Sequence, residues 1–193
     1  MTANQKLKVN LFSVDIIEQC KSNNRKAQLK LYNQYCDGMF IVAKRFVNDD
    51  FDAEDIVQEA FIKAFTKLHQ YKAEVTFGSW LKRIVINTSI DYLKSKKQFL
   101  YELDEVHLKV VDTSFEDEWF VDDTLSIEDV RTAISKLPEK YRYVVMLYLI
   151  EGYDHKEIAQ ILNITEVASR TQLSRGKTQL KQALKQKNYG TGY

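Results

Sequence analysis

The apolar residues of this chain recur with the spacing of an α-helix, and this periodicity constrains the fold more than any other feature. In residues 52–68 they form one continuous stripe, three or four positions apart: Ala53, Ile56, Val57, Ala60, Phe61, Ala64, Phe65 and Leu68. We expect further helices at 14–22, 25–47, 78–97, 126–136, 139–151, 154–162 and 165–187. No segment alternates with period two for long enough to form a strand. The sequence therefore predicts an all-α protein.

The distribution of charge divides the chain into three segments. Residues 1–101 carry 16 basic and 11 acidic side chains, residues 102–125 carry 1 and 9, and residues 126–193 carry 11 and 7. We predict two small helical domains, 1–97 and 126–193, joined by an acidic linker, 98–125. The linker pattern fits a solvated spacer and an active role equally well. Basic domains favour nucleic-acid partners, although an excess this small is a weak argument alone.

The sequence predicts a cytoplasmic protein. No apolar run approaches the roughly 18 to 20 residues of a bilayer span. Residues 1–10 lack the apolar core of a secretory signal. Cys20 and Cys36 have neither CxxC spacing nor a Cys/His cluster around them, so the sequence supports no disulfide framework and no zinc site.

An acidic run begins at Asp49 and suggests, at first, a metal site. With Asp50 as the first position of a calcium loop, Asp55 falls where glycine is needed, so that motif fails. Acids at a helix start are explained by capping and the helix dipole, and we predict Asp52 as the N-cap. The chain has three scattered histidines and no other catalytic constellation. We expect no metal, no cofactor and no enzyme activity.

The polar face of the helix predicted at 52–68 carries Asp55, Gln58 and Glu59 together with an outward-facing Ile62. A polar face with one exposed apolar residue is often a docking surface for a protein. It is also a common pattern on a simply solvated helix. The spacing alone does not separate the two interpretations.

The segment from Tyr71 to Lys97 combines aromatic and basic residues. Its helix is apolar on most sides and leaves one polar seam, formed by Arg83, Asn87, Asp91 and Lys94. Aromatic rings can stack on unpaired bases, and Lys72, Lys82, Arg83, Lys94, Lys96 and Lys97 could contact phosphates. We place Phe77 and Trp80 in the core and Tyr71, in the preceding loop, against a base.

Residues 154–184 have the pattern of a helix-turn-helix. Asp154 and Glu157 have capping-box spacing, Asn163 suits a left-handed turn, and Thr165 caps a second, longer helix. The outer face of that helix carries residues suited to a major groove: Arg170, Thr171, Ser174, Arg175 and Lys177. Seven basic against three acidic residues between 154 and 187 favour DNA over a protein partner. A structural helical hairpin remains the alternative.

Two stretches of this sequence resemble a known family. The run DAEDIVQEAFIKAF, followed by FGSWLKRIVINTSIDYLKSKK, resembles region 2 of sigma-70 family factors of the extracytoplasmic-function (ECF) group. The run LPEKYRYVVMLYLIEGYDHKEIAQILNITEVASRTQLSRGKTQL resembles their region 4. The resemblance covers residues 25–187, with both signatures in the expected order. It implies a transcription initiation factor that binds core RNA polymerase and directs it to promoters.

The resemblance also implies roles for individual residues. The beta-prime clamp helices of core RNA polymerase would be bound by Asp55, Gln58, Glu59 and Ile62. The beta flap would be a second contact of the protein with core polymerase. Contacts to the minus-10 element would come from Tyr71, Lys72, Arg83, Asn87 and Lys94. Contacts to the minus-35 element would come from Thr165, Arg170, Thr171, Ser174, Arg175 and Lys177. The linker would thread toward the active centre, and an anti-sigma factor would be a further partner.

The sequence departs from the family pattern in the recognition helix. Ser169 is a hydroxyl at a usually apolar position, and we expect it to bond back to the Thr165 carbonyl. Gly176 replaces a usual alanine and should weaken the helix by roughly 1 kcal/mol. The alternative function is a free-standing helix-turn-helix regulator that does not bind polymerase.

Overall fold

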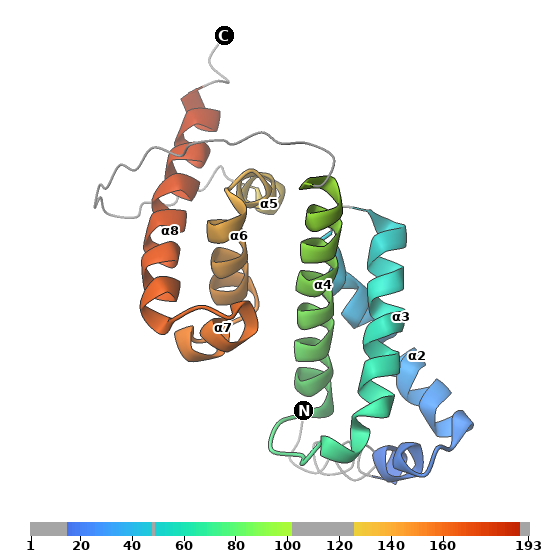
Figure 1. Ribbon diagram of the computed structural model, residues 1–193. Helices are drawn as coiled ribbons and strands as arrows, with labels where there is room; N and C mark the ends of the chain where they lie inside the picture. The colour runs from blue at the N-terminus through green and yellow to red at the C-terminus, as the bar shows by residue number, and fades with distance from the viewer. Residues whose placement is uncertain (1–14, 48, 102–125, 190–193) are drawn as a thin grey trace, which may run out of the picture. The chain divides into compact units, whose positions relative to one another are not determined.

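The computed structural model describes residues 15–47, 49–101 and 126–189, and the regular secondary structure of these residues is entirely helical, with no strand (Figure 1). The all-α prediction is confirmed. The chain divides into two compact units, Met1–Val106 and His107–Tyr193. Most of the predicted linker, residues 102–125, lies outside the described residues, so its boundaries and its role stay predictions.

The first unit is built around two antiparallel helices, α3 (Asp50–Thr66) and α4 (Phe77–Tyr101). Residues 15–21 are helical, and α2 (Arg25–Lys44) packs against both α3 and α4. A 3-10 turn, η1 (Leu68–Gln70), leads into the loop before α4. Small residues let α3 approach its neighbours closely, because Ala53, Ala60 and Ala64 are fully buried along its inner face.

The start of α3 differs from the prediction. Asp49, not Asp52, is the N-cap, and its carboxylate accepts hydrogen bonds from the Phe51 and Asp52 backbone N–H groups at 2.9 and 3.1 Å. The helix therefore begins three residues earlier than the predicted N-cap at Asp52 indicates. Both aspartates have capping chemistry, and the tertiary partner of Asp52 decides between them.

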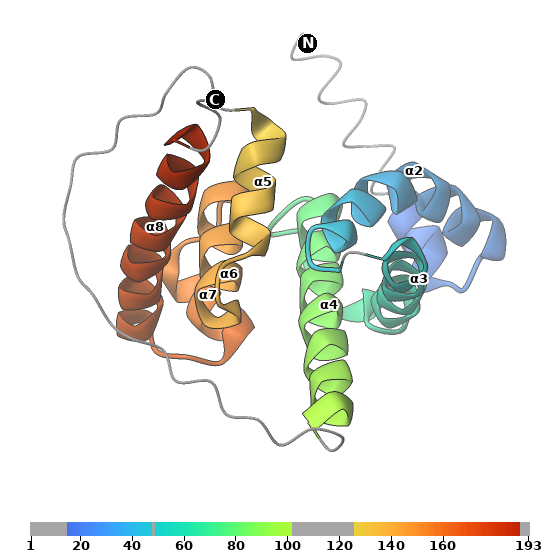
Figure 2. The same ribbon diagram turned by 90° about the horizontal axis from the view of Figure 1, so that it is seen from above.

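The second unit contains α5 (Ile127–Ser135), α6 (Glu139–Val145), a π-helical turn η2 (Met146–Ile150), α7 (His155–Leu162) and α8 (Glu166–Tyr189). Figure 2 shows α5 and α6 along one side of α8. Pro138 is the N-cap of α6. The core of this unit lies between α6, η2, α7 and α8 and contains Tyr141, Val144, Leu147, Ile158 and Leu180.

Gly176 fixes how closely α8 approaches α6. A Cβ atom at this position would lie 2.6 Å from Val145 Cγ2 and 3.3 Å from Tyr141 Cβ. The separation from Val145 is shorter than packed carbon atoms tolerate, and the one from Tyr141 is tighter than most such contacts. The sequence interpretation considered only the lower helix propensity of glycine. The structure shows that its missing side chain is needed for packing.

Candidate protein and nucleic-acid interfaces

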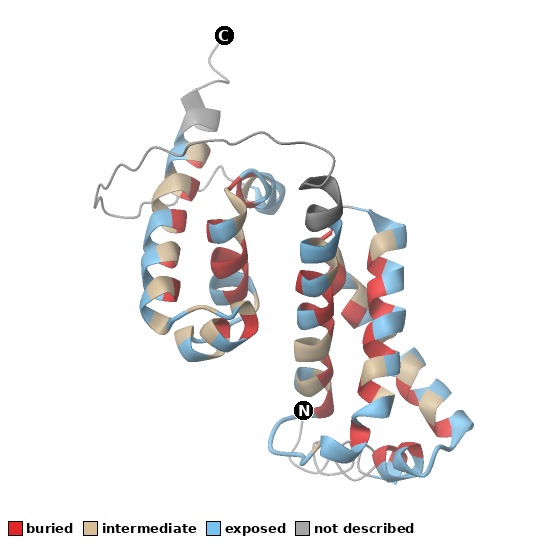
Figure 3. Cartoon of the chain, viewed as in Figure 1, coloured by how far each residue is buried: buried red, intermediate tan, exposed pale blue. Residues whose placement is uncertain are grey.

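The outer face of α3 carries the side chains predicted to dock a protein. Asp55, Gln58 and Glu59 are exposed, and 66% of Ile62 is accessible to solvent. Figure 3 shows buried residues along one side of α3 and exposed residues along the other. Glu59 pairs with Lys63 at 2.7 Å, whereas Asp55 and Gln58 have no side-chain hydrogen bond or ion pair with another described residue. The predicted docking residues therefore share one accessible face.

Sequence reasoning missed a second apolar residue on this face. Phe51 is 78% exposed, which is the largest exposed fraction among the large hydrophobic residues of the described chain. It lies in the first turn of α3, ahead of the stripe of polar residues. The sequence contains the 11-residue spacing from Phe51 to Ile62, but the predicted helix, 52–68, excluded Phe51.

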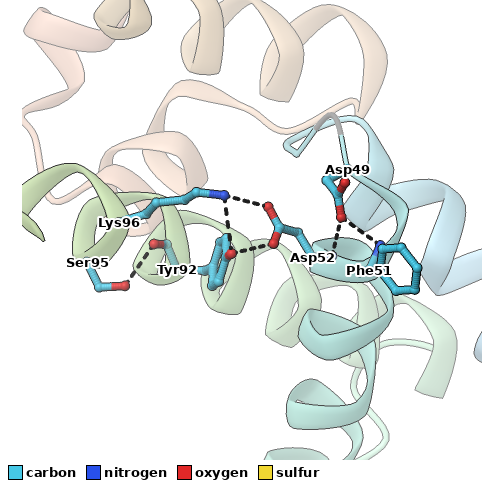
Figure 4. Close-up of polar contacts among 6 residues, drawn as sticks. All are labelled: Asp49, Phe51, Asp52, Tyr92, Ser95 and Lys96. Carbon is cyan, nitrogen blue, oxygen red and sulfur yellow. Dashed lines mark hydrogen bonds and ion pairs between the residues drawn. The ribbon is translucent and has the colours of Figure 1, made fainter. Parts of the chain in front are cut away.

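Asp52 ties the first turn of α3 to α4 (Figure 4). Its carboxylate accepts a hydrogen bond from the Tyr92 hydroxyl at 2.5 Å and an ion-paired hydrogen bond from Lys96 Nζ at 2.8 Å. These bonds from Lys96 and Tyr92 hold the pKa of Asp52 below its ordinary value of 3.8. The Asp52 carboxylate in turn raises the pKa of Tyr92. Lys96, which we had counted among possible phosphate contacts, is held on the α3 side of α4.

The loop before α4 holds Tyr71 in an aromatic cluster. The Tyr71 ring lies 5.7 Å from Phe77 and 5.3 Å from Trp80 between ring centroids, and its hydroxyl donates to the Val75 carbonyl at 2.7 Å. Burial raises the pKa of Tyr71. Ala73 has a left-handed backbone (φ 60°), which bends the loop sharply. The loop is thus a structured turn, with Tyr71 half-buried rather than free.

The other predicted minus-10 residues lie in the loop before α4 or on α4 itself. Lys72, Asn87 and Lys94 are exposed and Arg83 is half-buried, so the polar seam of α4 reaches solvent as expected. Phe77 is a core residue, as predicted. Trp80 is only half-buried, because it covers Tyr71 at the edge of the core, so its placement in the core was only partly right.

The helix-turn-helix has the predicted hydrogen bonds at its turn. Asp154 Oδ1 accepts from the Glu157 N–H at 2.8 Å and Glu157 Oε2 accepts from the Asp154 N–H at 3.0 Å, a complete capping box. Asn163 is left-handed, with φ 56° and ψ 50°. Thr165 Oγ1 accepts from the Ala168 N–H at 3.1 Å. The capping box fixes the start of α7, and the Thr165 bond fixes the start of α8.

The predicted minus-35 residues are accessible on α8. Thr165, Arg170, Thr171, Ser174 and Arg175 are exposed. Arg170 pairs with Glu166 at 3.2 Å, a surface ion pair of small strength that leaves the guanidinium accessible. Lys177 differs, because it is half-buried and its ammonium lies 5.5 Å from the centre of the Tyr148 ring.

Ser169 has a different partner from the one we expected. Its side chain is fully buried, and Oγ lies 2.9 Å from Nδ1 of His155 rather than bonding to the Thr165 carbonyl. The His155 ring stacks on Tyr148 at 4.9 Å. The hydroxyl thus joins α8 to the first residue of α7, which explains a polar side chain at this buried position.

The described part of the chain contains no cluster of three or more His, Cys, Asp or Glu residues that could hold a metal ion. Among the described helices, none combines the length and the apolar content of a membrane-spanning segment.

Comparison with known families agrees with both halves of this description. Residues 31–99 match Sigma-70 region 2, and residues 127–180 match Sigma-70, region 4. The chain belongs to the sigma-70 family. The ECF RNA polymerase sigma factor SigW of Bacillus subtilis is 32% identical over 177 residues, 88% of this chain and 95% of that protein. RNA polymerase sigma factor SigZ of the same organism is 30% identical over 154 residues, 80% and 85% of the two chains.

Solved structures of sigma factors share the fold. The sigma factor RpoE of Bartonella quintana, in complex with the anti-sigma factor NepR, has a TM-score of 0.57 at 19% identity, covering 81% of this chain and 95% of that one. CnrH in complex with the cytosolic domain of CnrY has a TM-score of 0.54 at 20% identity, covering 90% and 97%. This sigma factor is therefore a transcription initiation factor of the ECF group, a class of transcription factors rather than enzymes.

Proposed function

We propose that this sigma factor binds core RNA polymerase through the outer face of α3 and reads promoter DNA with α4 and α8. The observation that carries this assignment is the contrast in surface chemistry within one chain. The α3 face presents acids and apolar side chains, while α8 presents arginines and hydroxyls. Acid and apolar groups suit a basic protein surface, and arginines with hydroxyls suit base edges and phosphates.

For core polymerase, we assign Asp55, Gln58, Glu59 and Ile62 to the beta-prime clamp helices. Support comes from their shared accessibility and from the absence of competing described partners for Asp55 and Gln58. The second unit would meet the beta flap. An anti-sigma factor is a further expected partner, since RpoE of Bartonella quintana has been solved with one. We place the protein in the cytoplasm, where promoter DNA is accessible to it.

For the minus-10 element, we assign Tyr71, Lys72, Arg83, Asn87 and Lys94. The aromatic cluster gives Tyr71 and the half-buried Trp80 a fixed edge on which an unpaired base could stack. Arg83, Asn87 and Lys94 continue from that edge along α4 and would follow a separated strand. The geometry therefore favours contact with melted rather than paired DNA.

For the minus-35 element, we assign Thr165, Arg170, Thr171, Ser174, Arg175 and Lys177. The fixed turn supports this role, because the N-terminal residues of a recognition helix lie nearest the groove floor. Arg170 is placed to read a base edge once its surface pair with Glu166 opens. Lys177 lies farther along α8, beside Tyr148, and would contact phosphate.

The test of this function is promoter occupancy measured with the chain alone, with core polymerase alone, and with both together. A sigma factor gives specific occupancy and transcription only when both are present. A free-standing regulator, the alternative, would occupy the same promoter equally well without core. Equal specific occupancy with and without core would therefore overturn the proposal.

The minus-10 assignment has a separate test. Alanine at Tyr71, Arg83 or Asn87 should permit promoter binding but slow strand opening, because these groups act on separated bases. Transcription by each variant is compared on a duplex promoter and on a template with a pre-opened bubble. Activity should return on the bubble template. Variants that stay inactive there would place the defect elsewhere.

A further inference from the structure

We infer that Phe51 is a second apolar anchor of the polymerase-docking face, paired with Ile62 at the other end of the acidic stripe. This inference rests on the proposed function of the α3 face and extends it by one residue and one helical turn. The occupant is core RNA polymerase, and neither the family resemblance nor the residues assigned above include Phe51.

The helical geometry places Phe51 and Ile62 on one line. Eleven residues are three turns of an α-helix plus about 20°, and they span about 16 Å along the axis. Both side chains lie opposite the buried face of α3, which is formed by Ala53, Ile56, Ala60 and Ala64. Phe51 and Ile62 are 78% and 66% exposed. Two large apolar side chains aligned this way on a water-facing surface indicate a contact with another molecule.

The charge between these two residues identifies the chemistry of the occupant. Glu54, Asp55 and Glu59 are exposed acids on or beside the line from Phe51 to Ile62. Lys63 is the one basic residue of α3, and it is already paired with Glu59. The partner surface therefore needs two apolar pockets about 16 Å apart with basic side chains between them. This is a protein surface; the acids repel nucleic acid and anionic membrane.

The first turn of α3 is held more firmly than a helix end usually is. The Asp49 carboxylate caps the Phe51 N–H at 2.9 Å, and the next residue, Asp52, is tied to Tyr92 and Lys96 of α4 (Figure 4). The backbone that carries Phe51 is thus fixed on both sides. An anchor held in place before binding loses less conformational freedom on association, so more of its contact energy appears as affinity. Asp52 is accordingly a positioning residue for Phe51.

Four single variants of the full chain test the anchor by equilibrium binding to core polymerase. Phe51→Ala should weaken binding about tenfold, as truncation of an apolar anchor commonly does. Phe51→Leu should retain most of the affinity. Leu29→Ala is the matched control, because Leu29 is 61% exposed and belongs to α2 rather than α3, and it should bind as wild type. Asp52→Ala should weaken binding two- to threefold through its effect on the first turn.

The double variant Phe51→Ala with Asp52→Ala separates positioning from a general loss of structure. If Asp52 acts through Phe51, the double variant binds no more weakly than Phe51→Ala alone. If instead the fold-losses in affinity of the two single variants multiply in the double variant, Asp52 does not act through Phe51. Thermal unfolding of Phe51→Ala should match wild type, because its side chain is exposed.

Unchanged affinity of Phe51→Ala, together with lost affinity of an Asp55→Lys/Glu59→Lys variant, would overturn the anchor and leave the docking face in place. Unchanged affinity of both would overturn the docking face as well. Analytical sedimentation of the wild-type chain tests whether a second copy of this chain covers the face instead of polymerase. A dimer that Phe51→Ala dissociates would show that a second copy of this chain covers the face, which also overturns the inference.

Discussion

The exposed faces of α3 and α8 carry side chains of opposite charge, although both belong to long amphipathic helices. On α3 the outward residues are acids flanked by Phe51 and Ile62, and on α8 they are arginines and hydroxyls around an exposed Val167. The two helices are also held differently. Asp52 ties α3 to α4 through an ion pair, while Ser169 ties α8 to α7 through a hydrogen bond between its hydroxyl and the His155 ring. Helical periodicity alone does not distinguish a protein-binding face from a DNA-binding face; the charge and the exposed apolar residues do.

Charge reversal on α3 should produce the largest effect. The Asp55→Lys/Glu59→Lys variant should lose at least about 100-fold in affinity for core polymerase, because like charges placed across an interface cost several kcal/mol. Helicity should stay near that of wild type, since both side chains are exposed. Co-purification of the variant with core measures the loss. If the variant co-purified with core polymerase as well as wild type does, the outer face of α3 would be a solvated surface and not a docking surface.

Substitutions on α8 should act on DNA and leave core binding unchanged. With polymerase bound, Arg170→Ala should cost about 1 to 3 kcal/mol on the cognate minus-35 element and relax preference at one base pair. Lys181 lies one turn beyond Lys177 on α8, farther from the groove floor than Arg170, and should contact phosphate. Lys181→Ala should therefore weaken cognate and scrambled promoters alike and reduce the salt slope by about one unit. Promoter affinity is measured across salt concentrations. Equal losses on both DNAs for Arg170→Ala would identify it as a phosphate contact.

Glycine substitutions compare packing in the two units. Gly176→Ala should lower the free energy of unfolding of the second unit by about 1 to 3 kcal/mol, because the new Cβ would collide with Val145. Gly38→Ala, in the middle of α2, meets no atom within 4 Å and should stabilise the first unit by about 0.5 to 1 kcal/mol. Chemical denaturation of each variant gives both values. Stabilisation by Gly176→Ala would show that helix propensity outweighs the contact.

The Asp52 tie should give the stability of the first unit a small dependence on acid pH. The folded-state pKa of Asp52 is depressed by Lys96 and Tyr92. Its contribution is therefore present above the ordinary pKa of 3.8 and is lost as the pH falls through the lower folded pKa. Unfolding of wild type and Asp52→Ala is compared from pH 7 to pH 3, and their difference should shrink below about pH 4. A constant difference would mean that the carboxylate charge does not stabilise the fold.

Patterns local to a helix were predictable from the sequence. Some features depend only on residue type and spacing along one helix: the caps at Asp154 and Thr165, the left-handed Asn163 and the outward stripe of α3. The structure has all of them. Features that depend on tertiary contacts were not. Asp49, not the predicted Asp52, is the N-cap, because Asp52 has partners about 40 residues away in the sequence, on α4.

The same limit applies to residues whose role depends on a neighbouring helix. Ser169 bonds to His155, 14 residues earlier, and Gly176 is required by Val145 of α6. Neither relation follows from helical periodicity. Phe51 is the opposite case, since its spacing from Ile62 could have been noticed. It was missed because the helix was bounded one residue too late to include it.

The most direct test of the account is transcription by core polymerase from a library in which both the minus-35 and the minus-10 sequences are randomised. Core with the wild-type chain should select one sequence at each element. Core with Arg170→Ala should relax selection at one minus-35 position and leave the minus-10 selection unchanged, while core with Asp55→Lys/Glu59→Lys should show no selection. Absence of selection by the wild-type chain, or relaxation of both elements by Arg170→Ala, would contradict the division of labour between α3, α4 and α8.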